Sequence, residues 1–252
     1  MAYPIRADNG PAVVVQDVTK EFILPHERMV TLKGAILRAL RGRSGADRFV
    51  ALRNVSFEMQ RGEILGVVGR NGSGKTTLLS LIARIYLPTS GRIATQGRVC
   101  ALLGLGAGMD PELTGRDNIF LNATFYGLQR KEVLEQYNSI AEFSELGDFL
   151  LAPVRTYSFG MFQKLAFSVA AHLSPDVLLL DEVLAVGDVH FGAKSLHKLQ
   201  EICASGTTIV LVTHELDRLP DICARTIWLD CGEVMRDGDT RSVVQEYAAA
   251  CG

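Results

Sequence analysis

The chain has 252 residues, of which 48% are apolar and 21% are charged. This composition supplies enough apolar surface for a sizeable core and excludes global disorder. The 26 basic and 28 acidic residues leave a formal net charge of −2, so the overall positive charge typical of nucleic-acid-binding proteins is missing. The sequence contains no run of 18 or more apolar residues, and we therefore expect no membrane-spanning helix.

The first unusual segment, residues 26–48, follows a short apolar strand that begins at Val13–Val15. Its six basic residues exceed its two acidic residues by four. Apolar side chains recur within it at helical spacing, at Leu32, Ala35, Ile36, Ala39 and Leu40. Two interpretations remain open: an amphipathic helix packed on its own domain, or a basic helix at a membrane or a membrane partner.

The rest of the chain alternates strand and helix patterns. We expect strands at Val50–Met59, Ile64–Val68, Val177–Leu180 and Thr208–Val212, and a hairpin of Thr226–Leu229 with Glu233–Met235. Helical periodicity follows the second of these strands, dominates residues 116–172, and returns at Arg241–Ala249. Strands that alternate with helices predict an α/β fold with a mostly parallel sheet.

The strongest motif is the run Gly69–Thr76, which fits G-x-x-x-x-G-K-[ST] between a buried strand and a helix. Its glycines allow backbone N–H groups to point at phosphate oxygens, and the following helix N-terminus adds positive potential. Lys75 is placed to reach the β- and γ-phosphates, and Thr76 to bind Mg²⁺. We predict an ATP site formed by Gly69, Asn71, Gly72, Ser73, Gly74, Lys75, Thr76 and Thr77.

Polar residues follow two of the predicted buried strands. Asp181 and Glu182 come after Val177–Leu180, at the edge where α/β sheets bind ligands. We predict that Asp181 holds Mg²⁺ and that Glu182 polarises an attacking water; a solvated acid pair is the alternative. His214 follows the strand Thr208–Val212 and is placed to sense the γ-phosphate, although a histidine with a purely structural role fits equally.

The order of these motifs resembles the nucleotide-binding subunit of ABC transporters. The Walker A loop, signature, Walker B motif, D-loop and switch histidine of that family correspond to Gly69–Thr76, Tyr157–Met161, Val177–Glu182, Val186–Asp188 and His214. The stretches 113–118, 156–161, 165–170 and 183–188 are similar to the branch that exports lipid-linked polysaccharides: O-antigen, capsule and teichoic acid. The chain looks like the short form of that branch, without the added C-terminal carbohydrate-binding domain.

The resemblance implies an α/β P-loop ATPase core of mostly parallel sheet, within a single ABC ATP-binding domain that spans residues 1–252. It further implies an antiparallel β subdomain of residues 12–24, 49–60 and parts of 92–103. A helical signature subdomain of about 105–170 would face the permease. The basic segment 26–48 is expected near the membrane, by the entrance for the anionic substrate.

The resemblance also implies a mechanism that needs two copies. Two subunits pair head to tail around two ATP molecules with Mg²⁺, and the signature of one faces the phosphate loop of the other. Ser158 and Gly160, expected just before a helix Phe162–Ala171, would meet the γ-phosphate, and Asp188 of the D-loop belongs to the same nucleotide site. The catalytic residues implied are Glu182, His214 and Lys75.

Three features depart from the family pattern or leave it open: the signature, the Q-loop and the adenine platform. Phe159 and Met161 replace the first Gly and the Gln of the usual signature. Gly104 stands nearest to the Q-loop glutamine, and Gln96 comes too early to replace it. The adenine is expected to stack on Phe22, with Phe49 as the alternative and a core role for Phe22 as another.

The function implied is the ATPase subunit of a polysaccharide exporter, peripheral on the cytoplasmic face of the bacterial inner membrane. Its partners would be a second copy and integral membrane permease subunits, with no nucleic acid. A drug or small-molecule ABC exporter is the alternative. A chromosome ATPase is disfavoured because no heptad run or second cassette is present, and a regulator without turnover because Glu182 and His214 are both retained.

Overall fold

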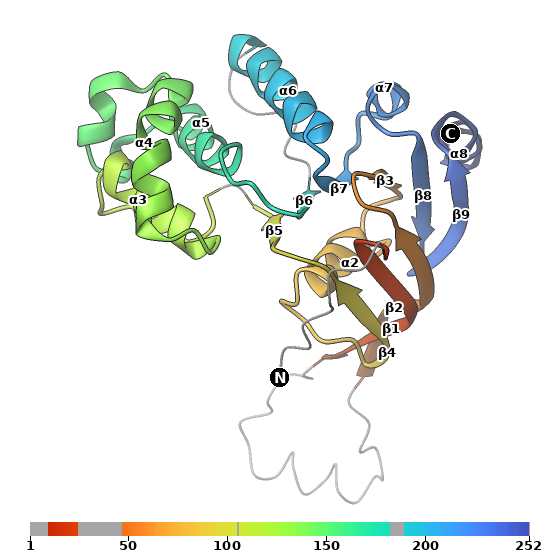
Figure 1. Ribbon diagram of the computed structural model, residues 1–252. Coiled ribbons are helices and arrows are strands. Elements are labelled where there is room, and N and C mark those ends of the chain that lie inside the picture. The colour runs from red at the N-terminus through yellow and green to blue at the C-terminus, as the bar shows by residue number, and fades with distance from the viewer. Residues whose placement is uncertain (1–9, 25–46, 105, 182–188, 252) are drawn as a thin grey trace, which may run out of the picture.

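The computed structural model describes residues 10–24, 47–104, 106–181 and 189–251. Their strands form two sheets, and a group of helices stands to one side of them (Figure 1). The basic segment 26–48, apart from its last two residues, falls outside the described part of the chain. None of the helices described has the length and apolarity needed to cross a bilayer.

The smaller sheet contains the first two strands of the chain, paired as an antiparallel hairpin. It has three strands in the order β2 (Asp47–Met59), β1 (Val13–Leu24) and β4 (Ser90–Thr95), all antiparallel. This sheet is the antiparallel β part expected from the sequence.

The larger sheet has six strands in the order β5 (Val99–Leu102), β6 (Val177–Asp181), β7 (Thr208–Val212), β3 (Ile64–Val68), β8 (Arg225–Asp230) and β9 (Glu233–Asp239). All neighbouring strands are parallel except β8 and β9, which form an antiparallel hairpin. The stretch 92–103 is thus divided: its first part belongs to β4, but β5 joins the parallel sheet beside β6. This division agrees with the expectation that only parts of 92–103 belong to the antiparallel β subdomain.

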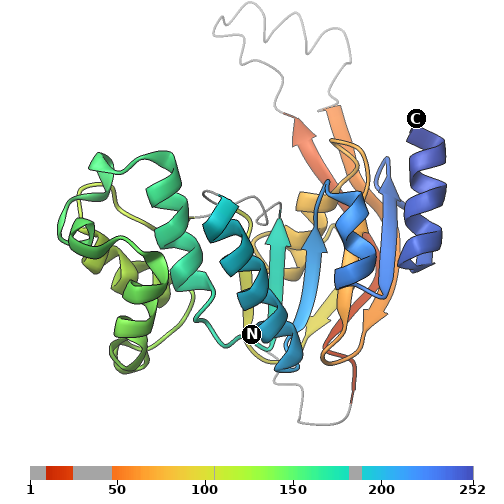
Figure 2. The same ribbon diagram turned by 90° about the horizontal axis from the view of Figure 1, so that it is seen from above.

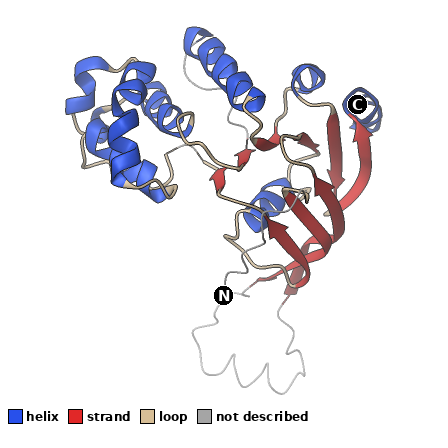
Figure 3. Ribbon diagram, in the orientation of Figure 1, coloured by secondary structure: helices blue, strands red, loops and turns tan. Residues whose placement is uncertain are grey.

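The helices fall into three places (Figures 1 and 3). The helical group, on one side, contains α3 (Gly115–Phe125), α4 (Arg130–Ser144), α5 (Phe159–Ala170) and the 3₁₀ turns Gly147–Leu151 and Val154–Thr156. Helix α2 (Lys75–Ile82) lies near the three-stranded sheet. The remaining helices each follow a strand of the larger sheet. Helix α6 (Val189–Ala204) follows β6, and α8 (Thr240–Cys251) follows β9. Helix α7 (Leu219–Ile222) follows β7 after a 3₁₀ turn at Leu216–Arg218.

The two faces of the six-stranded sheet are buried in two separate cores. In β6, Val177 and Leu179 pack with α2 and the small sheet, whereas Leu178 and Leu180 pack with the helical group, α6 and α8. Side chains alternate across a strand, so a strand that is apolar throughout can fill both cores. This is why the continuous apolar runs at β3, β6 and β7 predicted their strands so closely.

Candidate nucleotide site

The phosphate loop runs from the end of β3 into α2, and two of its glycines lie against neighbouring backbone. A Cβ atom added to Gly69 is 2.1 Å from the carbonyl oxygen of Leu229, and one added to Gly74 is 2.7 Å from that of Ala51. Gly74 has a φ of 108° and is the N-cap of α2. These positions accept no side chain, and the loop therefore curls tightly over the start of α2.

The side chain of Lys75 is buried within the loop, whereas that of Thr76 is exposed and faces Asp181. Lys75 is 7% exposed, and its Nζ donates to the carbonyl oxygens of Gly69 (2.7 Å) and Arg70 (3.0 Å). Thr76 Oγ1 donates to Asp181 Oδ2 at 2.8 Å, across 105 residues of sequence. The structure thus brings the hydroxyl and the carboxylate together, as a shared metal site requires.

Residues of the loop fit a triphosphate and its magnesium ion. Within the described residues, the Oγ of Ser73 is buried and has no hydrogen-bond partner, an arrangement that favours a polar ligand. The Thr76 hydroxyl and the Asp181 carboxylate are hard oxygen ligands of the kind that Mg²⁺ takes. Asn71 and Gly72 form the exposed turn of the loop, and Thr77 is half-buried in the first turn of α2.

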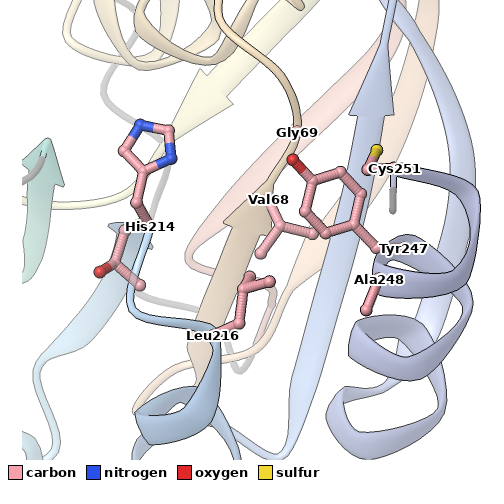
Figure 4. Close-up of a pocket in the computed structure, with 8 residues that line it drawn as sticks. Val68, Gly69, His214, Leu216, Tyr247, Ala248 and Cys251 are labelled. Atoms are coloured by element: carbon pink, nitrogen blue, oxygen red, sulfur yellow. The ribbon is translucent and has the colours of Figure 1, made fainter.

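His214 joins this site because of the strand order. Strand β7 lies between β6 and β3, so the carboxyl ends of these three parallel strands place Asp181, His214 and the loop at one edge. His214 is exposed and borders a cavity of about 330 Å³ whose walls include Gly69 (Figure 4). This position is compatible with contact to a phosphate held by the loop.

The signature lies in the helical group, apart from α2 (Figures 1 and 2). Ser158 is the N-cap of α5, and its Oγ accepts a hydrogen bond from Met161 N at 3.2 Å. Helix α5 therefore begins at Phe159, three residues earlier than expected, and Gly160 lies in its first turn rather than before it. Phe159 is 76% exposed, so a bulky apolar ring stands beside the helix N-terminus.

The structure gives Phe22 other partners. Its ring lies edge to face with Tyr86, at 5.4 Å between centroids, and the Lys20 ammonium is 5.0 Å from its centroid. Phe49, opposite Phe22 in the β1–β2 register, is 49% exposed. The adenine platform therefore stays a prediction.

Some of the residues singled out in the sequence lie outside the described part of the chain. For others, the structure shows where they lie but not what they do. Glu182 and Asp188 lie within residues 182–188, which are not described. Gly104 follows β5 at the same sheet edge as Asp181. Gln96 precedes β5, at the opposite edge, where its side chain accepts a hydrogen bond from Arg61, in agreement with its exclusion as a Q-loop substitute.

Two contributions to this site were missed by the sequence reasoning. Gly232, in the β8–β9 turn, donates its N–H to the carbonyl oxygen of Ser73 at 3.0 Å and so supports the loop from behind. Tyr247 and Cys251 of α8 line the cavity opposite His214 (Figure 4), and burial raises the pKa of Tyr247. The sequence indicated a turn at Cys231-Gly232, but it gave no sign that this turn contacts a loop about 160 residues away.

Comparison with known sequences places this site in a family. The family model described as ABC transporter matches residues 52–185, more than half of the chain. The O-antigen export system ATP-binding protein RfbB of Klebsiella pneumoniae is 41% identical over 95% of this chain and 98% of its own length.

Other relatives are longer than the matched region. RfbB of Myxococcus xanthus is 47% identical, but this chain spans only 56% of its length. The teichoic acids export ATP-binding protein TagH of Lactococcus lactis is 41% identical, and 51% of its length is covered.

Among solved structures, the chain is similar to a dimeric structure of the ATP-binding cassette MJ0796 bound to ADP and Pi. The TM-score is 0.71 at 23% identity, over 91% of this chain and 99% of that one. This likeness confirms the α/β P-loop ATPase fold with its antiparallel and helical parts.

Proposed function

The chain belongs to the ABC transporter family, and from this premise we propose that it binds and hydrolyses ATP to drive export of a lipid-linked polysaccharide across the bacterial cytoplasmic membrane. The observation that carries the proposal is the Thr76–Asp181 contact beside a loop built around Lys75. It supports a nucleotide site held together by residues far apart in the sequence. We treat residues 1–252 as a single ABC ATP-binding domain.

The names of the relatives support a glycan as the cargo. RfbB of Klebsiella pneumoniae, which matches nearly end to end, is named as an O-antigen export protein, and TagH as a teichoic acids export protein. Both cargoes are polysaccharides. Neither of these names points to a drug or small-molecule cargo, the alternative.

In this proposal each part of the site has a separate task. The backbone N–H groups of the loop and the Lys75 ammonium bind and orient the phosphates, and the buried Ser73 hydroxyl gains a partner. Thr76 and Asp181 hold Mg²⁺, which supplies electrostatic stabilisation of the transferred phosphoryl group. Glu182 accepts a proton from the attacking water, and His214 contacts the γ-phosphate.

We further propose that hydrolysis takes place between two copies of the chain. Ser158 and the first turn of α5, with Gly160, would face ATP on the other copy, and Asp188 would lie at the same interface. Phe22 would stack on the adenine. The dimer would work with integral membrane permease subunits as a peripheral assembly on the cytoplasmic face of the inner membrane, without nucleic acid.

Replacing the proposed base tests the chemistry. Glu182→Gln is expected to lower the rate of ATP hydrolysis at least about a hundredfold, the scale of general-base loss, because the amide cannot accept the proton. ATP binding is retained, so a dimer stable in ATP should accumulate. Phosphate release and light scattering of the purified chain measure the two effects, with Glu201→Gln on the exposed face of α6 as the matched control.

The same variant tests the cargo in cells. Source bacteria whose only copy carries Glu182→Gln are expected to retain lipid-linked glycan inside and to lose it from the surface. Normal surface glycan, together with lost export of a small molecule, would contradict the polysaccharide assignment. Full ATPase activity of the purified variant would instead remove Glu182 from its role.

A further inference from the structure

Helix α6 connects the helical group to the rest of the molecule. Figures 1 and 2 both show α6 between α5 and strands β6 and β7. The chain enters α6 directly after residues 182–188, which follow the Asp181 carboxylate. Contacts between α6 and the helical group therefore link the region around Asp181 to the helices that carry the signature. The proposed mechanism places both of these regions at ATP.

One carboxylate makes that contact with charges from two helices. Glu145 immediately follows α4, in the left-handed conformation with a φ of 58°. Its Oε1 is 2.8 Å from Lys194 Nζ of α6, and its Oε2 is 3.8 Å from Lys164 Nζ of α5. The hydrogen bond from Lys194 lowers the pKa of Glu145, so the carboxylate is charged at neutral pH.

Lys194 is held by more than the ion pair. Its ammonium also donates to the carbonyl oxygen of Phe143 at 3.0 Å and lies 4.5 Å from the centroid of the Phe143 ring. The side chain is 31% exposed. Three kinds of contact in a partly buried position restrict the conformation of this side chain much more than an ion pair restricts an exposed surface lysine.

An aromatic cluster lies beneath the ion pair. Phe191, one turn before Lys194 on α6, is fully buried, and its ring centroid is 5.7 Å from that of Phe143 and 6.1 Å from that of Phe167. The Lys164 ammonium is 5.1 Å from the Phe191 centroid. The aromatic contacts and the ion pairs therefore both join α6 to Phe143 of α4 or Glu145 just after it, and to α5.

We propose that Lys194, through Glu145, is a positioning residue that sets the orientation of the signature helix α5 relative to the sheet. Lys164 lies six residues after Ser158 on the same stretch of α5, so a change at Glu145 moves the helix that carries the signature. The inference rests on the proposed function, because it assumes that Ser158 meets ATP on a second copy. In this proposal Lys194 does not contact ATP. It affects only how well the signature of one copy fits against the nucleotide site of the other.

The test separates ATP binding from dimer formation. In a Glu182→Gln background, Lys194→Met keeps the aliphatic stem and removes the charge. The single chain should bind a fluorescent ATP analogue as before, because the phosphate loop is unchanged. The protein concentration needed for ATP-dependent dimerisation, followed by light scattering, should rise about tenfold, the factor that corresponds to about 1.4 kcal/mol. Lys194→Arg should restore most of the dimerisation.

Lys198→Met is the matched control, because Lys198 pairs with Glu201 on its own helix at 3.0 Å. Thermal unfolding of each variant shows whether a substitution lowers the stability of the whole chain. A variant with an unchanged unfolding temperature and weaker dimerisation has lost positioning rather than stability. Equal dimerisation of Lys194→Met and its parent, or an equal loss in Lys198→Met, overturns the positioning role. A parent that binds ATP and never dimerises contradicts instead the proposed two-copy mechanism on which this inference rests.

Discussion

Two glycines of the phosphate loop are needed for different reasons. A Cβ atom on Gly69 would collide with the carbonyl oxygen of Leu229, a backbone atom of β8 that cannot rotate away. Gly72 has a φ of 81°, but a Cβ atom there meets no described heavy atom within 4 Å. Gly69 is thus required for space, and Gly72 only for its backbone conformation.

The pair Gly69→Ala and Gly72→Ala tests this distinction. Gly69→Ala is expected to abolish ATP binding and to lower the free energy of unfolding by about 3 kcal/mol or more, since the loop must shift away from β8. Gly72→Ala should cost only about 1–2 kcal/mol, the penalty for a left-handed residue, and should still bind ATP. Urea unfolding and titration with a fluorescent ATP analogue measure both quantities; equal ATP affinities in the two variants would argue against the steric explanation.

A half-buried titratable group, His172, lies just after the end of helix α5. Nδ1 of His172 lies 2.7 Å from the carbonyl oxygen of Ser168, and because a carbonyl only accepts, the ring nitrogen donates. Burial lowers the pKa of His172 below its ordinary value of 6.5, although the Ser168 carbonyl opposes this. The charged groups near the ring are Lys194, Lys198 and Glu201 of α6. The folded chain therefore holds this histidine neutral.

The stability of the chain should accordingly decrease in mild acid. The unfolded chain takes up a proton near pH 6.5 before the folded chain does, so the free energy of unfolding falls as the pH is lowered through that value and levels off below the folded pKa. His172→Gln keeps a donor but does not titrate, and it should flatten this decrease across about pH 8 to 5. Urea unfolding at several pH values measures it. Glu145 titrates below this range, and an unchanged pH dependence in His172→Gln would exclude the histidine as the cause.

At the scale of the whole molecule, the partly buried guanidinium of Arg225 joins the two sheets. Arg225 of β8 donates to both carboxylate oxygens of Asp237 in β9 at 2.7 Å, to Glu63 Oε1 at 2.9 Å and to the carbonyl oxygen of Glu58 in β2 at 2.8 Å. These carboxylates raise the pKa of Arg225. The side chain is about one-third exposed, so its bonds are only partly screened by solvent.

Arg225→Met is therefore expected to lower the free energy of unfolding by about 2 kcal/mol, the scale of hydrogen bonds to charged groups. The comparison is Arg53→Met, which removes an ion pair with Glu233 of 3.5 Å between exposed side chains and should cost less than about 1 kcal/mol. Chemical denaturation at low and high salt compares the two. Similar losses for both variants would mean that the hydrogen bonds of Arg225 contribute no more stability than an exposed ion pair between the same two sheets.

Local pattern was sufficient for much of this architecture. The bounds of β3 and β7 agree with the predicted strands residue for residue, since an apolar run bounded by turn residues defines a strand buried on both faces. The family resemblance supplied what local pattern lacks: the division into sheet and helical parts, and the role of Ser158 and Gly160 toward a second copy.

The start of α5 was misjudged, and the partner of β5 was not predicted, for separate reasons. Helix α5 begins where the Ser158 hydroxyl caps it, three residues before the apolar periodicity becomes clear. Strand β5 is short and follows the antiparallel β4 closely in sequence, but it pairs with β6, more than 70 residues later.

The amino-acid sequence alone determined the phosphate loop, the order of the motifs and the main strands, because those depend on neighbouring residues and on backbone conformation. Only the tertiary structure decided that Thr76 meets Asp181, that Gly232 supports the loop, that Tyr86 lies against Phe22, and that Lys194 reaches Glu145. Periodicity states that a side chain is buried or exposed, but which partner it meets depends on how whole elements pack, and residues far apart in the chain carry no local signal of that contact.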